Sequence, residues 1–140
     1  IRNILSLREK MKTMYGETLS LKQFGVEEPK EHDDFLARYI EIVKANISNP
    51  ELDVSVIYEA LGMSRTNFYR KVKTVTGLSP IELIKNIRLE AGAKLLKESD
   101  MNVSEIAQHI GFSSRSYFAR SFKAVYGMSP TEYQETESQN

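Results

Sequence analysis

Two stretches of this 140-residue sequence combine several cationic side chains with a complete lack of acidic ones. Residues 64–76 and 113–126 contain, respectively, Arg65, Arg70, Lys71 and Lys73, and Arg115, Arg120 and Lys123. Arginine can donate two hydrogen bonds to the O6 and N7 atoms of guanine, and lysine attracts phosphate as a point charge. The chemistry that these residues favour is therefore recognition of an anionic polymer.

The distribution of charge supports this interpretation, although 19 basic and 19 acidic side chains cancel over the whole chain. Residues 54–130 hold 11 Lys and Arg against 6 Asp and Glu. Residues 1–53 hold 8 against 10, and residues 131–140 hold none against 3. A positive middle segment between acidic ends is a local footprint for nucleic acid, despite a net charge of zero.

Both basic stretches belong to an internal repeat. A shift of 49 residues places Leu61-Gly62-Met63-Ser64 on Ile110-Gly111-Phe112-Ser113. Beyond the turn the offset becomes 50, which places Gly77-Leu78-Ser79-Pro80 on Gly127-Met128-Ser129-Pro130. We assign the one inserted residue to the long helix of the second copy. Each copy predicts a short helix, a tight turn and a longer helix, which is a helix-turn-helix unit.

The turns and helix ends carry matching signals in both copies. Gly62 and Gly111 stand where the turn needs a left-handed backbone, and Ser64 and Ser113 follow as the expected N-caps. Each long helix is expected to end at a glycine followed by a capping box, formed by Gly77, Ser79 and Glu82 and by Gly127, Ser129 and Glu132. The duplicated signals predict the same boundaries twice.

The fold class predicted from periodicity is all-α, because no segment alternates at period two. A helix from Asp33 to about Asn49 should bury Leu36, Tyr39, Ile40, Val43 and Ile47. Further helices are expected near residues 54–61, 64–76, 80–97, 103–110, 114–126 and 130–135. The helix at 80–97 would be about 27 Å long, and Gly92 inside it indicates a close approach of another element.

Three regions are predicted along the chain: a connector helix and linker at 1–32, a double helix-turn-helix domain at 33–134 and a polar tail at 135–140. Apolar residues in the first region follow the spacing of a coiled-coil seam, at Ile4, Leu7, Met11 and Met14. This helix either continues from an upstream domain or packs on its own domain. In the first case its seam could join two copies as a homodimer.

The two long helices separate into a core face and a partner face. Phe68, Val72 and Val75, and likewise Phe118, Phe122 and Val125, recur at spacings that must face the core. Tyr117 is also expected in the core, which leaves Tyr69 as the exposed aromatic residue. On the partner face, Arg70 and Arg120 are suited to base readout, and Lys73 and Lys123 to phosphate contacts.

Residues 33–134 resemble the C-terminal DNA-binding domain of the AraC/XylS family of bacterial transcription regulators. The motifs that carry the resemblance include Leu61 to Lys71, Gly77-Leu78-Ser79-Pro80, Ile87-Arg88-Leu89, Ile106 to Phe112 and Tyr117 to Lys123. The resemblance implies seven helices, with two homeodomain-like helix-turn-helix subdomains joined by a long linker helix. It also implies recognition helices in neighbouring major grooves of double-stranded DNA. DNA contacts are implied at Arg65, Thr66, Tyr69, Arg70, Arg115, Ser116, Tyr117, Ala119 and Arg120.

Two positions depart from that pattern. Tyr58 stands where the second copy has the small Ala107, so packing in the first unit should differ. Ala119 can offer a base only an apolar contact, such as one with a thymine methyl group. Because the two units differ, we expect a directional DNA site without internal symmetry.

The N-terminal helix and linker resemble the join between a receiver domain and its DNA-binding domain in hybrid two-component sensors. This resemblance implies the output domain of a two-component regulator, with RNA polymerase as a further candidate partner. The sequence has no run of about 18 apolar residues, so we expect no membrane contact by this chain. A cytoplasmic location follows as an expectation, and it leaves open a parent protein anchored in the inner membrane.

Other functional classes find less support in the sequence. The chain has no cysteine, and neither His32 nor His109 has a spaced partner, so we expect no metal site and no cofactor. Its seven glycines never come closer than nine residues, and no nucleophile and base can be paired, so an enzyme is not expected. A helical protein-interaction module remains the competing interpretation. Loss of DNA affinity with rising salt would distinguish the two.

Overall fold

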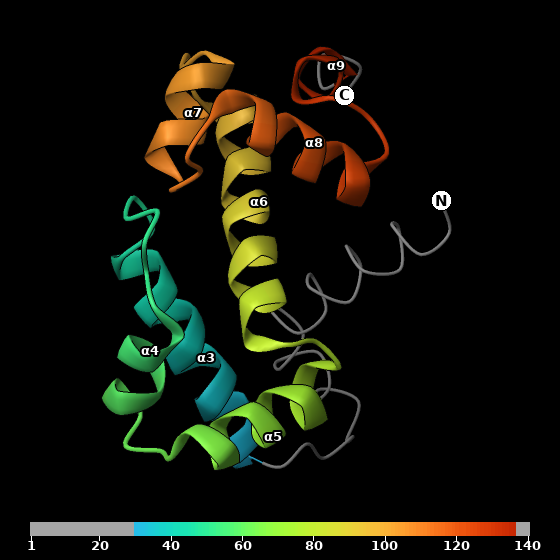
Figure 1. Ribbon diagram of the computed structural model, residues 1–140. Helices are drawn as coiled ribbons and strands as arrows, with labels where there is room; N and C mark the ends of the chain where they lie inside the picture. The colour runs from blue at the N-terminus through green and yellow to red at the C-terminus, as the bar shows by residue number, and fades with distance from the viewer. Residues whose placement is uncertain (1–29, 137–140) are drawn as a thin grey trace.

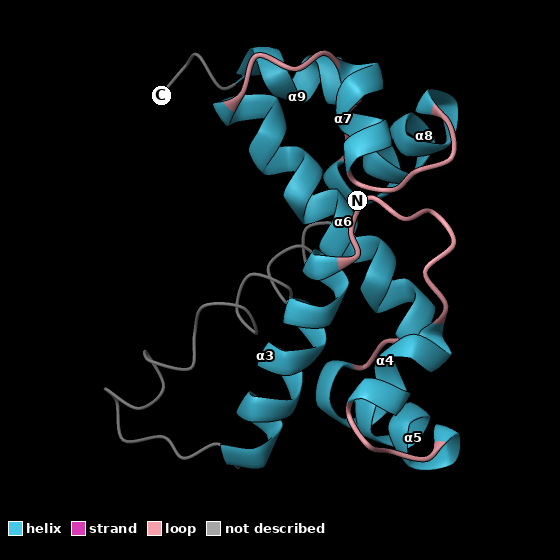
Figure 2. Cartoon of the chain, turned by 90° about the vertical axis from the view of Figure 1, so that its left-hand side faces the viewer, coloured by secondary structure: helices cyan, strands magenta, loops and turns pink. Residues whose placement is uncertain are grey.

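The computed structural model describes residues 30–136, and within that range it consists of helices and connecting turns without a strand (Figures 1 and 2). The all-α prediction is confirmed there. The predicted helix at 1–16, with its seam, lies outside the described residues. The helices are α3 (Lys30–Ala45), α4 (Val54–Ala60), α5 (Arg65–Thr76), α6 (Pro80–Glu98), α7 (Val103–His109), α8 (Arg115–Tyr126) and α9 (Pro130–Thr136).

Helix α6 forms the spine of the molecule and serves two separate cores. Figure 1 shows it upright, with α3, α4 and α5 around its lower end and α7, α8 and α9 around its upper end. Its first half contributes Leu83 and Ile87 to one hydrophobic cluster, and its second half contributes Leu89 and Leu96 to the other. We call α3, α4, α5 and the first half of α6 the first unit, and we call the second half of α6 together with α7, α8 and α9 the second unit. The two helix-turn-helix subdomains and the long linker helix are thus confirmed.

Helix α3 differs from the prediction at both ends. It begins at Lys30 rather than Asp33, and it ends at Ala45, before the expected Asn49. Turns follow because the Asn46 side chain donates to the Ile42 carbonyl at 2.8 Å and the Asn49 backbone N–H donates to the Asn46 carbonyl at 3.0 Å. The expected buried face is confirmed at Leu36, Tyr39, Ile40 and Val43. Its last residue, Ile47, is only half-buried. That last side chain packs on the core of the second unit.

The helix boundaries are set by the predicted caps. The Ser79 side chain accepts from the Glu82 backbone N–H at 3.2 Å, and a Glu82 carboxylate oxygen accepts from the Ser79 N–H at 2.9 Å. The same reciprocal pair opens α9 at Ser129 and Glu132. Left-handed glycines end both long helices and shape both turns, with φ of 77° at Gly77, 79° at Gly127, 71° at Gly62 and 88° at Gly111. The predicted glycines and the two predicted capping boxes are therefore confirmed.

The inserted residue lies in the second turn and not, as predicted, in the long helix. Both α5 and α8 contain 12 residues, whereas the turn before α8 is one residue longer than the turn before α5. Phe112 of this turn belongs to the second core, with its ring 5.4 Å from that of Phe118, and the extra residue follows it. As a result Ser114, rather than Ser113, caps α8, and its Oγ accepts from the Tyr117 N–H at 3.1 Å.

The core faces of the long helices are confirmed with one adjustment. Phe68, Val72, Phe118 and Phe122 are fully buried. The predicted Val75 and Val125 are only half-buried, and the next residues, Thr76 and Tyr126, take the buried positions. Thr76 tolerates burial because its hydroxyl donates to the Val72 carbonyl at 2.8 Å and accepts from the Leu78 N–H at 3.0 Å.

Candidate nucleic-acid interface

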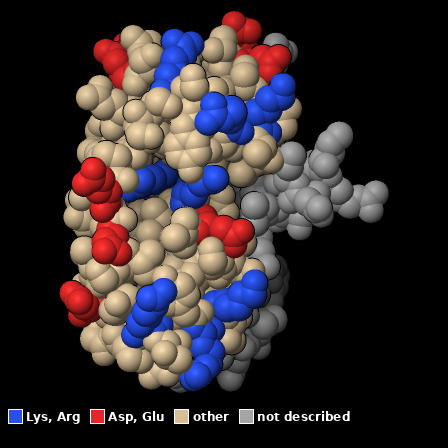
Figure 3. All heavy atoms as spheres, viewed as in Figure 1, with Lys and Arg blue, Asp and Glu red and all other residues tan. Residues whose placement is uncertain are grey.

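Helices α5 and α8, which carry the basic stretches, lie on the same side of the molecule. Figure 2 shows both helices at its right-hand edge, at opposite ends of α6. That edge corresponds to the face that Figure 3 presents to the viewer. At 1.5 Å per residue the 19 residues of α6 span about 28 Å, close to the ~34 Å between successive major grooves on one face of DNA. The fold therefore sets the two basic helices at a separation of the order that DNA requires.

Aromatic packing holds α5 against the spine and turns its polar face outward. The fully buried ring of Phe68 stacks on Tyr39 at 5.5 Å between centroids, and the Tyr39 hydroxyl donates to the Pro80 carbonyl at 2.9 Å. Burial is the main cause that raises the pKa of Tyr39, with the nearby Tyr69 as a second cause, so the phenol stays a donor. Tyr58, whose bulk departs from the second copy, fits beside Phe68 with 5.7 Å between ring centroids.

The predicted contact residues of α5 form one exposed group near its N-terminal half. The Arg65 guanidinium lies over the Tyr69 ring at 4.8 Å, and Arg70 donates from Nη1 to Asn67 Oδ1 at 3.3 Å. Arg65, Arg70 and the neighbouring Thr66 are exposed. Tyr69, which was predicted on an exposed face, is half-buried, because its ring packs edge-on against Phe68 at 6.0 Å.

Lys73 lies apart from this group, at the end of α5. Its Nζ donates to the Gly77 carbonyl at 3.3 Å, which places the ammonium group at the C-terminus of the helix. The charge there is favourable to the helix dipole, and the side chain is exposed. A phosphate contact by this lysine would share the ammonium with the helix end.

Helix α8 presents a matching exposed face. Its candidates Arg115, Ser116, Arg120 and Lys123 are exposed, and Ala119 is half-buried. Below them, the Phe122 ring stacks on Tyr126 at 4.3 Å and fixes the helix on its own core.

Tyr117 corrects the predicted core. Its side chain is 39% exposed, whereas we expected this aromatic residue in the core beside Phe118. The ring leans on Phe112 at 5.2 Å, and the Lys85 ammonium lies 5.5 Å from its centroid. The first turn of α8 therefore offers an exposed aromatic side chain, at one of the positions that the family resemblance implies.

Lysine and arginine gather over α5 and over α8 in Figure 3, with acidic side chains between and beside them. Glu82 lies in the first turn of α6, and its pKa is lowered chiefly by the N–H of Ser79 and also by Lys73 and Lys85. The pKa of Glu132 is lowered in the same way by Ser129 and Lys123. These capping glutamates place negative charge near Lys73 and Lys123, the lysines in the last turns of α5 and α8.

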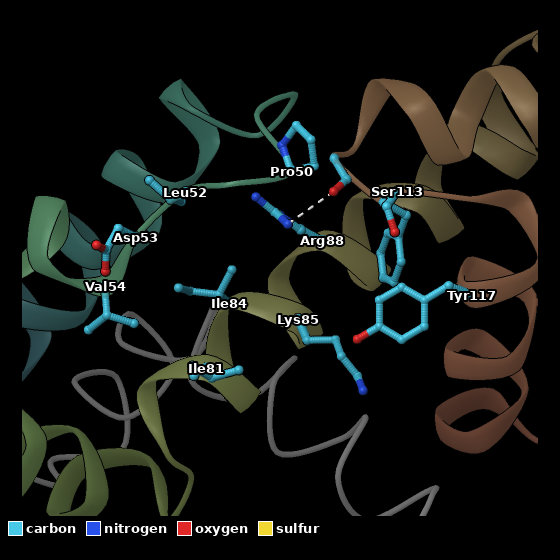
Figure 4. A pocket seen from close by; sticks show the side chains of 12 residues that line it. Pro50, Leu52, Asp53, Val54, Ile81, Ile84, Lys85, Arg88, Ser113 and Tyr117 are labelled. Carbon is cyan, nitrogen blue, oxygen red and sulfur yellow. Dashed lines mark hydrogen bonds between the residues drawn. The ribbon is translucent and has the colours of Figure 1, made fainter.

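A cavity of about 300 Å³ lies between the two units and is lined by residues of both (Figure 4). Arg88 lies at its base: Nη1 donates to the Gly111 carbonyl at 3.2 Å, and Nη2 donates to the Asn49 carbonyl at 2.6 Å. Burial lowers the pKa of Arg88, and its Nε is buried without a hydrogen-bond partner among the described residues. Sequence reasoning gave Arg88 no role. The available signal was a charged residue between the apolar Ile87 and Leu89 in a helix that must serve two cores.

None of the helices between residues 30 and 136 is long and apolar enough to cross a membrane. No group of three or more potential metal ligands is found among those residues either.

Comparisons with known proteins agree with this geometry. Residues 57–136 match the model of a helix-turn-helix domain family. The chain is 31% identical over 139 residues to histidine kinase P4 of Formosa agariphila, and the match covers 99% of this chain and 10% of the kinase. It is 35% identical over 100 residues to the HTH-type transcriptional regulator MtrA of Neisseria gonorrhoeae, covering 70% of this chain and 33% of that protein. The chain thus spans a tenth to a third of these relatives.

The fold is also similar to solved structures. The DNA-binding domain of AdpA, a global transcriptional factor solved in complex with a target DNA, is 26% identical, with a TM-score of 0.65. The match covers 77% of this chain and 93% of that domain. This family consists of DNA-binding domains and not of enzymes, in agreement with the expectation from the sequence. The chain belongs to the AraC/XylS-type family of helix-turn-helix DNA-binding domains.

Proposed function

We propose that this chain recognises double-stranded DNA in a sequence-specific manner, with α5 in one major groove and α8 in the next. The main support for this proposal is that α5 and α8, two basic helices without acidic residues, lie on the same side of α6 with their polar faces exposed. A helix about 10–12 Å wide fits a major groove about 12 Å wide. In this proposal residues 33–134 form the reading domain, with 1–32 as connector and 135–140 as tail.

The exposed side chains suggest a division of roles. Arg70 and Arg120 occupy equivalent positions on the two helices and would donate to guanine O6 and N7. Lys73 and Lys123 would contact phosphates, which orient the protein without reading sequence. The remaining proposed contacts are Arg65, Thr66, Tyr69, Arg115, Ser116, Tyr117 and Ala119. Among these, Tyr69 and Ala119 differ most in chemistry, so the two half-sites should differ.

We further propose that the domain is the output module of a two-component transcription regulator in the cytoplasm. The near-complete match to a histidine kinase supports this proposal, because it includes the N-terminal residues outside the family model. Such a regulator could dimerise through Ile4, Leu7, Met11 and Met14, contact RNA polymerase and belong to a parent anchored in the inner membrane. A truncation starting near Asp33 that dimerises as well as the 140-residue chain would contradict the dimer seam.

The test of DNA reading uses Arg70→Ala and Arg120→Ala, with Lys94→Ala as the matched loss of one exposed cation from the opposite face of α6. Each arginine variant should lower affinity for a selected DNA site by about 1–3 kcal/mol and keep its helical content. The Lys94 variant should bind as the wild type does. Unchanged affinity in both arginine variants would contradict the proposal.

A helical protein-interaction module is the alternative that the same experiment addresses. Wild-type affinity for duplex DNA should fall steeply between about 50 and 200 mM salt, because binding releases counterions from phosphates. Absence of binding at the lower salt concentration would favour the protein-interaction module.

A further inference from the structure

The two units share little besides α6. Most helix packing lies within each unit or against this spine. Along α6 the core changes abruptly, since Ile87 belongs to the first cluster and Leu89 to the second. Arg88 therefore stands at the boundary between the cores. The relative orientation of the units depends on whatever fastens them at this point.

Residues 46–52, which follow α3, form the fastening on the side of the first unit. Ile47 packs on the second core, and the Ser48 hydroxyl donates to the His109 carbonyl at 2.8 Å. The carbonyl of Asn49 accepts from Arg88, as described above. Three consecutive residues of the first unit thus contact the second unit or the side chain that bridges to it.

Gly111 completes the contact on the side of the second unit. Its carbonyl accepts the other guanidinium nitrogen of Arg88, and its φ of 88° lies in the left-handed region. A β-carbon here would run into the Ile47 carbonyl oxygen and would stand 2.9 Å from Arg88 Cζ. By contrast, a β-carbon on Gly62, at the equivalent turn of the first unit, would meet nothing within 4 Å. The absence of a side chain at Gly111 thus permits the junction.

We infer that Arg88 is a positioning residue that holds α5 and α8 in one mutual orientation and thereby sets the spacing between the two half-sites of the DNA. The inference rests on the proposed function. The planar guanidinium bonds one carbonyl from each unit at the same time, a geometry that the single ammonium of lysine cannot reproduce. Preorganisation of two linked heads favours DNA in which both half-sites have the matching separation.

The experiment compares Arg88→Met with Lys94→Met, which removes an exposed cation from the same helix without touching the hydrogen bonds of Arg88. Three duplexes obtained by selection are used: both half-sites at the selected spacing, the same site with two base pairs inserted, and one half-site alone. We expect the wild type and Lys94→Met to lose roughly tenfold or more in affinity on insertion. We expect Arg88→Met to lose less than about threefold, with unchanged binding to one half-site.

Two further comparisons guard against simple loss of folding. Gly111→Ala should lose the preference for the selected spacing. Gly62→Ala also puts a side chain on a left-handed backbone, but its β-carbon meets no neighbouring atom, so this variant should keep the preference. Ser48→Ala, at an exposed position, should reduce the preference mildly, and Arg88→Lys should be intermediate between wild type and Arg88→Met. If Arg88→Met does not fold, as judged by circular dichroism, the Gly111 and Gly62 pair decides.

The outcomes distinguish the inference from the function on which it rests. A wild type that gains nothing from a second half-site would overturn the proposed two-groove reading itself. A wild type that prefers the selected spacing, together with an Arg88→Met variant that keeps this preference, would overturn the role of Arg88 alone. Equal loss by Arg88→Met on all three duplexes would also overturn it.

Discussion

Gly92 of α6 lies directly against Phe118 of α8: a β-carbon on Gly92 would stand 3.2 Å from two atoms of the ring. The same β-carbon would stand 2.9 Å from Ile110 Cδ1. Phe118 and Ile110 are both fully buried, so neither can move aside freely. The second basic helix is therefore seated on the spine at the one residue of α6 that lacks a side chain.

The first prediction is that Gly92→Val destabilises the protein by about 1–3 kcal/mol, because added carbons overpack a filled core. Lys94→Val is the control, since it places the same side chain on the exposed side of α6. Urea denaturation measures both. A Gly92→Val variant as stable as the control would show that the second core has room there.

The second prediction concerns the lysine at the end of α5. Lys73→Met should weaken binding about equally on all duplex sequences and should lower the slope of log affinity against log salt by about 1. Arg70→Ala serves as the comparison, because it should alter sequence preference at one position. If Lys73→Met leaves the slope unchanged, its ammonium serves only the helix end at Gly77.

The third prediction concerns acid stability. The pKa of Glu82 and of Glu132 is lowered from the ordinary value of 4.5 in the folded protein, first by backbone N–H groups of Ser79 and Ser129. As the pH falls below 4.5, the unfolded chain takes up these protons first. Their contribution to stability is therefore complete above that pH and is lost as the pH falls through the lowered folded values.

Replacing both glutamates by glutamine keeps the acceptors and removes the titration. The double variant should therefore lose less stability than the wild type between about pH 5 and pH 3. The measurement is the urea midpoint as a function of pH. If the urea midpoint falls equally with decreasing pH in the wild type and the double variant, the stabilising role of the ionised Glu82 and Glu132 is contradicted.

The fourth prediction tests how the first unit is seated. Tyr39→Phe removes a buried hydrogen bond to the Pro80 carbonyl and should cost about 0.5–1.5 kcal/mol of stability. Tyr58→Phe, a half-buried ring of the same core, is the comparison and should cost less. Thermal or urea unfolding is the measurement, and equal stability of the two variants would contradict the role of this hydrogen bond.

Most of the fold could be predicted from the sequence because its signals are local and duplicated. Left-handed glycines, capping boxes and apolar periodicity depend on residues a few positions apart, so each unit could be outlined without the other. The position of the inserted residue could not be predicted, because Ser113 and Ser114 are equivalent as caps in sequence. In the structure Ser114 caps α8, and Ser113 belongs to the preceding turn.

The candidate site followed the same pattern. Outward-facing positions such as Arg70 and Arg120 followed from helical periodicity, and both are exposed. Tyr117 was misplaced because an aromatic side chain was expected in the core, whereas the buried face of this helix begins only at Phe118. The junction of the units escaped prediction because Arg88 bonds carbonyls 39 and 23 residues away, and backbone acceptors carry no sequence signal.

The most direct test of two unlike reading helices on one spine is selection of bound sequences from a random duplex pool with the 140-residue chain. We predict a bipartite motif whose halves differ in sequence and whose centres lie about one helical turn, roughly 10–10.5 base pairs, apart. A single uninterrupted half-site, a palindrome or a pool without any motif would contradict that account.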